Sequence, residues 1–97
     1  MEIAEVVCPA QVEDKIQRLH RVSSREVEEV FLNFPEFRRG PRSKRAGEYL
    51  YYALGQTDAG RYLFVVFNYE RRNRRVLIVT AREMNEREKR GYKKRYG

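Results

Sequence analysis

Three consecutive segments rich in aromatic, aliphatic and β-branched residues constrain the fold of this 97-residue chain more than any other feature. They are EYLYYALGQT at 48–57, RYLFVVFNYE at 61–70 and RRVLIVTAR at 74–82, separated by the turn sequences DAG and RRN. Such segments bounded by turn residues are typical of β-strands, so we expect a three-stranded antiparallel meander. Because polar residues hardly alternate within them, both faces of the sheet should be partly covered, one by helices and one by the chain's end or a partner.

Two amphipathic helices are expected before the sheet. Apolar residues recur at helical spacing after Pro9, which predicts a first helix over about residues 10–20. Ser23 and Glu26 form a capping box followed by apolar residues on one face, so a second helix should begin here and end before Pro35. Both helices should pack on one face of the sheet.

The last segment, MNEREKRGYKKRYG, predicts a third helix with little apolar surface, opened by Asn85 and Glu88 as a capping pair. The segment EFRRGPRSKRAGE at 36–48 contains Gly, Pro and five basic residues, so we expect an exposed loop or a short edge strand. The predicted fold is therefore α+β, with two N-terminal helices packed on a small antiparallel sheet of three to four strands and a C-terminal helix. The length predicts a single domain over residues 1–97.

The charge of the chain predicts a polyanionic partner. Lys and Arg number 21 against 14 Asp and Glu, a net charge of +7. Residues 1–36 carry −4 and residues 37–97 carry +11, so a nucleic acid should meet the second part of the chain. The candidate RNA-binding residues are Arg38, Arg39, Arg42, Lys44, Arg45, Lys89, Arg90, Lys93 and Lys94.

Other classes of partner and cofactor are disfavoured by the sequence. It has no apolar segment long enough to span a bilayer, and acidic residues stand where a secretory signal would be basic, so we expect a cytoplasmic protein with no membrane partner. Cys8 and His20 are the single cysteine and histidine, which excludes an internal disulfide and a structural zinc site. We expect neither a metal nor a cofactor.

Three blocks of the sequence resemble the BrnT family of bacterial toxins. These blocks are HRVSSREVEEVF at 20–31, ALGQTDAGRYLFVVF at 53–67 and TAREMNEREKRGY at 80–92, the central one being the most specific. The resemblance implies a fold similar to that of the RelE and ParE toxins and a ribonuclease activity that inhibits translation, with RNA, including ribosome-associated mRNA, as substrate. It also implies neutralisation by a cognate ribbon-helix-helix antitoxin (BrnA-like), with operator DNA bound only through the antitoxin complex.

The resemblance also implies a set of site residues. The matching positions that it marks as catalytic are His20, Glu48, Arg61, Arg82 and Tyr92. The chain departs from many family members at Leu50, where they have arginine, and at Arg21, where they have glycine.

Metal-free RNA cleavage requires a base, an acid and cations that stabilise the phosphorane-like transition state. Arginine suits the cationic role, because its planar fork binds two phosphate oxygens. If a loop near residue 73 closes the second hairpin, Arg61 and Arg82 should meet at the same end of adjacent strands as a phosphate-facing pair. The two arginines lie on the same face of the sheet only if the numbers of any two residues paired across the strands add up to an odd number. Alternatively, Arg61 merely solubilises a strand end.

The other three candidates have competing interpretations. Glu48 lies about 27 Å from Arg61 at about 3.4 Å per residue, so it should lie near Tyr69 and neutralise neighbouring arginines. His20 fits proton transfer or a C-terminal helix cap. Tyr92 fits proton donation, base stacking or a docking face. A noncatalytic RNA- or antitoxin-binding module that has lost ribonuclease activity therefore remains the alternative to a ribonuclease.

Overall fold

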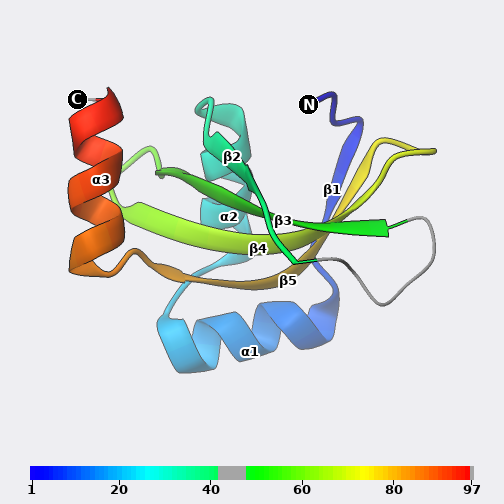
Figure 1. Cartoon of the computed structure of the whole chain (residues 1–97). Coiled ribbons are helices and arrows are strands. Elements are labelled where there is room, and N and C mark those ends of the chain that lie inside the picture. Colours follow the sequence, from blue (N-terminus) through cyan, green and yellow to red (C-terminus); the bar gives the residue numbers. More distant parts are fainter. Residues whose placement is uncertain (42–47, 97) are drawn as a thin grey trace.

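A five-stranded mixed sheet forms the centre of the structure, a computed structural model that describes residues 1–41 and 48–96 (Figure 1). The elements follow one another as β1 (Glu5–Val7), α1 (Ala10–His20), α2 (Ser24–Leu32), β2 (Glu36–Arg39), β3 (Glu48–Gln56), β4 (Tyr62–Glu70), β5 (Arg75–Glu83) and α3 (Glu86–Tyr96). The expected α+β class is confirmed, and so are the meander and the three helices.

The sheet is larger than predicted. Its order is β1-β5-β4-β3-β2, in which β2 to β5 are antiparallel neighbours and β1 pairs parallel to β5. The prediction of three to four antiparallel strands is therefore wrong, because β1 was missed. A strand of three residues is too short to show a period of two, and its pairing depends on contacts with distant β5. The short edge strand expected in the basic segment is present as β2.

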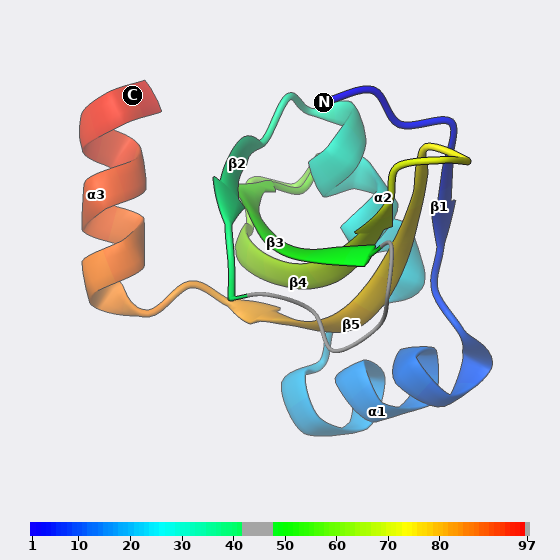
Figure 2. The same ribbon diagram turned by 45° about the vertical axis from the view of Figure 1, so that its right-hand side comes forward.

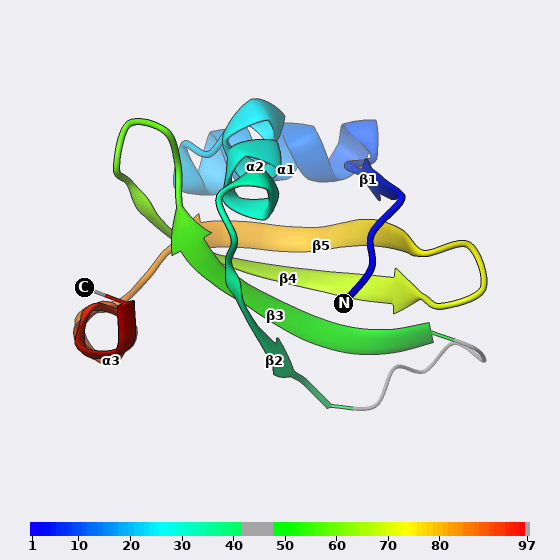
Figure 3. The same cartoon turned by 90° about the horizontal axis from the view of Figure 1, so that it is seen from above.

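Helices α1 and α2 cover one face of the sheet (Figure 3). Along β4 every second residue is buried, and Val65 and Phe67 belong to the same apolar core as Ile16 of α1 and Val27 of α2. Burying a side chain of this size contributes about 1.5–3 kcal/mol. We call this side of the sheet the helix face.

The opposite side, called here the open face, is partly covered by the chain's end, as predicted. Within the described part of the chain, no helix lies across its middle, and α3 stands at one end of the sheet (Figures 2 and 3). A small second cluster of Leu54, Met84 and Tyr92 attaches α3 there. The open face therefore keeps half-buried aromatic and aliphatic side chains, which explains why the strands lack polar alternation.

The predicted helix starts are confirmed in detail. Ser23 Oγ accepts from the Glu26 amide at 3.1 Å, and Glu26 accepts from the Ser23 amide at 3.0 Å. Asn85 and Glu88 form the same reciprocal pair at the start of α3, with both bonds 2.8 Å long. Each pair satisfies amides that have no partner within the helix.

A β-bulge interrupts the pairing of β4 with β5. Val66 pairs with Thr80, whereas Phe67 pairs with Ile78, so Val79 is an extra residue in β5. If the ladder continued from Phe67 and Ile78 without the extra residue, the side chains of Thr80 and Arg82 would point to the helix face. Ala81 would then point away from the core. The bulge keeps Ala81 buried and leaves polar side chains outside.

Candidate nucleic-acid interface

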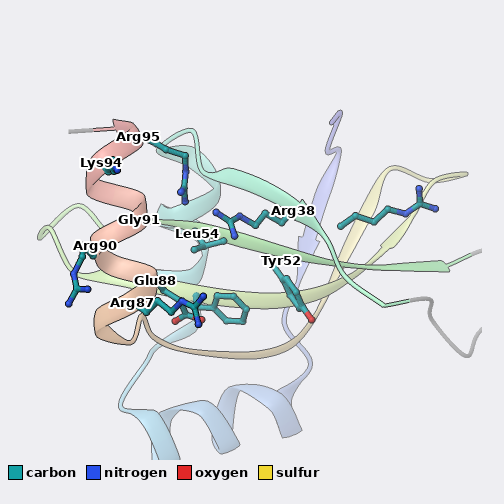
Figure 4. A pocket seen from close by; sticks show the side chains of 11 residues that line it. Arg38, Tyr52, Leu54, Arg87, Glu88, Arg90, Gly91, Lys94 and Arg95 are labelled. Carbon is teal, nitrogen blue, oxygen red and sulfur yellow. The ribbon is translucent and has the colours of Figure 1, made fainter.

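A cleft of about 740 Å³ lies between α3 and the open face of the sheet (Figure 4). One side of α3 forms its wall, and strands β2, β3 and β4 form its floor. The lining residues are Arg38, Arg39, Tyr52, Leu54, Phe64, Arg87, Glu88, Arg90, Gly91, Lys94 and Arg95. We call this hollow the α3 cleft.

The α3 cleft is strongly basic. Six of its lining residues are Arg or Lys and one is a glutamate, so it favours an anionic ligand. Four of the cations come from α3, where residues 87, 90, 94 and 95 repeat at helical spacing and therefore lie on one side of the helix. Arg87 and Arg95 were not among the predicted RNA-binding residues, although this spacing was visible in the sequence.

Aromatic side chains form the floor of the α3 cleft. Tyr52 on β3 and Phe64 on β4 have ring centroids 5.0 Å apart, and Leu54 lies beside them. Flat rings next to cations suit single-stranded nucleic acid, in which each stacked base contributes about 1–3 kcal/mol. Neither ring was among the predicted site residues.

Arg82 on β5 is the cross-strand neighbour of Phe64 and lies over its ring. Its Cζ is 4.4 Å from the centre of the Phe64 ring, and its two terminal nitrogens donate to the two oxygens of Glu88 at 2.8 and 2.9 Å. The hydrogen bonds from Arg82 outweigh burial and hold the pKa of Glu88 below its ordinary value. Glu88 is therefore ionised near neutral pH, and Arg82 is fixed at the edge of the cleft.

Arg61 lies on the helix face and has a full set of partners. Its Nη1 donates to both oxygens of Glu26 at 3.1 Å and to the Arg21 carbonyl at 2.7 Å. Its Nη2 donates to the His20 carbonyl at 3.2 Å and to Glu83 at 2.9 Å. Arg61 thus ties the junction of α1 and α2 to the end of the sheet, instead of presenting a free cation.

The predicted phosphate-facing pair of Arg61 and Arg82 is wrong. The two residues do lie at the same end of neighbouring strands, but Arg82 pairs with Phe64, and the paired numbers at this end have an even sum. An even sum places the two arginines on opposite faces. On the other side of the bulge the numbers of paired residues have an odd sum. The extra residue Val79 therefore places the two arginines on opposite faces.

The remaining catalytic candidates are dispersed. Glu48 begins β3 opposite Glu70, at the far end of the sheet from Arg61, as the strand length predicted. His20 is the last residue of α1, on the helix face. Tyr92 is 7% exposed and packs on Tyr62 with ring centroids 5.9 Å apart, so it forms the docking side of α3. Arg61 and His20 are joined by the hydrogen bond from Arg61 to the His20 carbonyl.

The predicted RNA-binding residues divide into three groups. Arg38, Arg39, Arg90 and Lys94 line the α3 cleft. Lys89 and Lys93 instead lie over the Tyr62 ring, at 5.0 and 5.3 Å from its centre. The predicted residues Arg42, Lys44 and Arg45 lie outside the residues that the structure describes.

Glu36 closes one end of the α3 cleft. It accepts from Arg95 of α3 at 3.1 Å and from Arg38 on its own strand at 2.6 Å, so it links β2 to the helix. Burial alone would raise the pKa of Glu36, but the hydrogen bonds from Arg95 and Arg38 outweigh it and hold the pKa below its ordinary value. The link remains ionised at neutral pH.

Leu50 lies on the open face, opposite Asn68 of β4. The Oδ1 atom of Asn68 is buried and has no hydrogen-bond partner among the described residues. An arginine at position 50, which the family resemblance leads one to expect, would start directly across from this acceptor. Leucine at this position places no cation there, and the acceptor has no partner among the described residues.

Two further properties bear on the kind of site. Over residues 1–41 and 48–96, no three His, Cys, Asp or Glu side chains gather closely enough to bind a metal ion. None of the described helices is long and apolar enough to cross a membrane.

Comparison with known proteins identifies one family. The family model described as "Ribonuclease toxin, BrnT, of type II toxin-antitoxin system" matches residues 11–88. This range includes α1 from its second residue, α2, β2 to β5 and the start of α3. No curated protein sequence matches the chain.

Proposed function

Because the chain belongs to the BrnT family of ribonuclease toxins of type II toxin-antitoxin systems, we propose that it binds and cleaves single-stranded RNA in the α3 cleft. The family implies an antitoxin partner. In this proposal the reaction needs no metal, and the loss of RNA inhibits translation. The protein acts in the cytoplasm, where the RNA is located.

The observation that carries the proposal is the composition of the α3 cleft. Six basic residues line a hollow of about 740 Å³ that also contains two aromatic rings. Cations bind the phosphates regardless of sequence, and the rings of Tyr52 and Phe64 offer stacking surfaces for the bases. A double helix would not expose its base faces, which favours a single strand.

Arginines of the cleft supply the electrostatic part of the reaction. Arg87 and Arg90 are exposed, so their guanidinium groups can bind the scissile phosphate and stabilise the charge that develops on its oxygens. Arg82 adds a fixed positive charge over the Phe64 ring. Glu88 is the acidic residue nearest to this phosphate site, but its lowered pKa makes it a weak base toward the 2′-hydroxyl. In this proposal the cleft supplies charge stabilisation and positioning, while water accepts the 2′-hydroxyl proton and protonates the leaving 5′-oxygen.

A specific observation supports the second candidate function, a noncatalytic RNA- or antitoxin-binding module. The residues expected to transfer protons, His20, Glu48 and Tyr92, are dispersed over the described structure, and Leu50 stands where a family arginine is expected. A chain with the binding cleft but without a proton-transfer group would hold RNA and leave it intact.

We also infer the kind of antitoxin. A BrnA-like ribbon-helix-helix protein would neutralise the toxin by covering the open face and the α3 cleft, because this surface combines half-buried apolar side chains with a high positive charge. Operator DNA would be bound through the antitoxin, since the second helix of this chain is acidic and cannot serve as a recognition helix.

Inducible expression in a bacterial host tests the proposal. Growth and total RNA integrity are followed for the wild type, for Arg87→Ala/Arg90→Ala, and for the matched control Lys15→Ala/Arg18→Ala, which removes the same charge from exposed α1. Growth arrest with RNA loss in the wild type and the control, but not in the cleft variant, supports the ribonuclease. Arrest that is equal in all three proteins at matched soluble levels rejects the cleft as the active site. Intact RNA and normal growth with the wild type favour the noncatalytic module.

A further inference from the structure

We propose that a second hollow around Tyr49 extends the α3 cleft into one continuous binding path for single-stranded RNA. This inference rests on the proposed function of the cleft. The second hollow has a volume of about 570 Å³ and is lined mainly by Tyr49, Tyr51 and Tyr69 together with Arg39, Arg71 and Arg74. We call it the distal hollow, because it lies at the other end of the strands from α3.

The distal hollow repeats the chemistry of the α3 cleft. The Cζ atoms of Arg39 and Arg71 lie 5.5 and 5.8 Å from the centre of the Tyr49 ring. Each such contact at the surface contributes about 0.5–1 kcal/mol, which holds the guanidinium groups near the ring while their charges stay accessible. Arginine planes stack on bases and also bind phosphates, so this cluster suits a nucleotide.

Carboxylates near the distal hollow do not cancel its charge. Glu2 pairs with Arg74 at 3.0 Å, but both side chains are more than half exposed, and such a pair contributes about 0–1 kcal/mol. Glu70 is occupied by Arg75 at 3.1 Å. A phosphate can therefore displace the Glu2 pair at little cost, and Arg71 stays available beside it.

Arg39 connects the two hollows. It lines the α3 cleft, the distal hollow and a smaller hollow of about 350 Å³ between them, which also contains Tyr49 and Leu50. Within the described residues β2 is an edge strand, so the proposed path turns around β2 (Figure 3). Arg38 pairs with Tyr52 and faces the cleft, whereas Arg39 pairs with Tyr51 on the helix face. The consecutive residues Arg38 and Arg39 thus place one arginine on each face of the sheet.

The length of the path separates the distal hollow from the cleft experimentally. Leu54 at the cleft and Tyr49 at the distal hollow are five positions apart on β3, about 17 Å along the strand at about 3.4 Å per residue, and this odd separation places them on opposite faces, so a ligand that spans both must also turn around the edge strand β2. A tetranucleotide fits one hollow, whereas a strand of about 12 nucleotides, within the roughly 4–16 used by other single-strand binders, reaches both.

The test measures binding of fluorescent 2′-O-methyl RNAs of about 4 and about 12 nucleotides by anisotropy, since the modification blocks attack by the 2′-oxygen. The variants are Arg71→Ala/Arg74→Ala, with Lys15→Ala/Arg18→Ala as its control of equal charge, and Tyr49→Phe/Arg71→Ala, which removes one charge and has Lys15→Ala as its control. We expect the first variant to weaken binding of the long RNA about tenfold and to reduce its salt slope by about 1.4, at about 0.7 per phosphate contact. Binding of the short RNA should be unchanged, and thermal melting should confirm that each variant is folded.

Several outcomes would overturn the distal hollow. Unchanged binding of the long RNA in both variants rejects it while leaving the α3 cleft intact, and so does an equal effect in the control. A polyglutamate peptide that binds the wild type more tightly than the long RNA, and loses affinity in the variants, assigns the hollow to an acidic polypeptide. No binding of either RNA to the wild type rejects the cleft and the distal hollow together.

Discussion

Replacement of Arg61 by alanine should destabilise the fold, although the residue lies at a strand end of a basic protein. Its side chain is 25% exposed and joins α1, α2 and β5 through Glu26, Glu83 and two backbone carbonyls. Partial exposure screens the ion pairs, so the pair with Glu26 contributes about 1 kcal/mol and the weaker, more exposed pair with Glu83 less. The two carbonyl bonds at the end of α1 add about 1 kcal/mol more. We expect a total loss of about 2–3 kcal/mol.

Urea denaturation followed by circular dichroism measures this loss. For a domain of this size, a loss of about 2–3 kcal/mol in the free energy of unfolding corresponds to a decrease in Tm of about 10–20 °C. Arg18→Ala is the control, since that arginine forms an exposed ion pair 4.0 Å long and should change the free energy of unfolding by less than about 0.5 kcal/mol. Arg61→Lys should give an intermediate value, because an ammonium group cannot reach all four partners. A loss in Arg61→Ala no larger than that of the control would show that this network does not stabilise the fold.

Two other predictions concern the same corner of the molecule. Arg21→Gly should raise the free energy of unfolding by about 0.5–1 kcal/mol, because Arg21 has a φ of 53° in the left-handed region that glycine adopts without strain. Thermal melting measures this change, and a fall in Tm would contradict it. Burial alone would raise the pKa of Glu26, but hydrogen bonds from Ser23 and Arg61 hold it below its ordinary value. A group with a lowered folded pKa stabilises the protein above its unfolded pKa, and this contribution is lost as the pH falls through the folded pKa. The wild type should therefore lose its advantage over Glu26→Gln as the pH falls from about 5 to 3, and a pH-independent difference in denaturant midpoints would exclude the ionised pair.

Much of the local structure could be predicted, because local signals determine it. Helix α1 begins and ends where the apolar spacing placed it, and both capping pairs formed as expected. The position of Arg61 and Arg82 at one end of the meander followed from the turn sequences alone. Each of these features depends on residues close together in the sequence.

Features that depend on distant contacts could not be predicted. β1 is recognisable only from its parallel partner β5, and Arg61 finds its partners in three elements that precede or follow it by more than 20 residues. The cleft required α3 to be placed against the open face, although the spacing of Arg87, Arg90 and Lys94 already marked one side of that helix. The parity rule for the two arginines followed from strand geometry, but nothing in the sequence indicated the bulge.

The bulge at Val79 also affects how the length of this strand can change in evolution. Deletion of a residue within a strand usually exchanges the faces of all residues beyond it. Here, removal of Val79 would leave Phe67 opposite Ile78 and Val66 opposite Thr80, since the deleted residue has no partner in the ladder. Arg82 would remain across from Phe64. A one-residue gap at this position in an alignment of relatives is therefore compatible with an unchanged cleft, and chains of different length can keep the same arginine over the same ring.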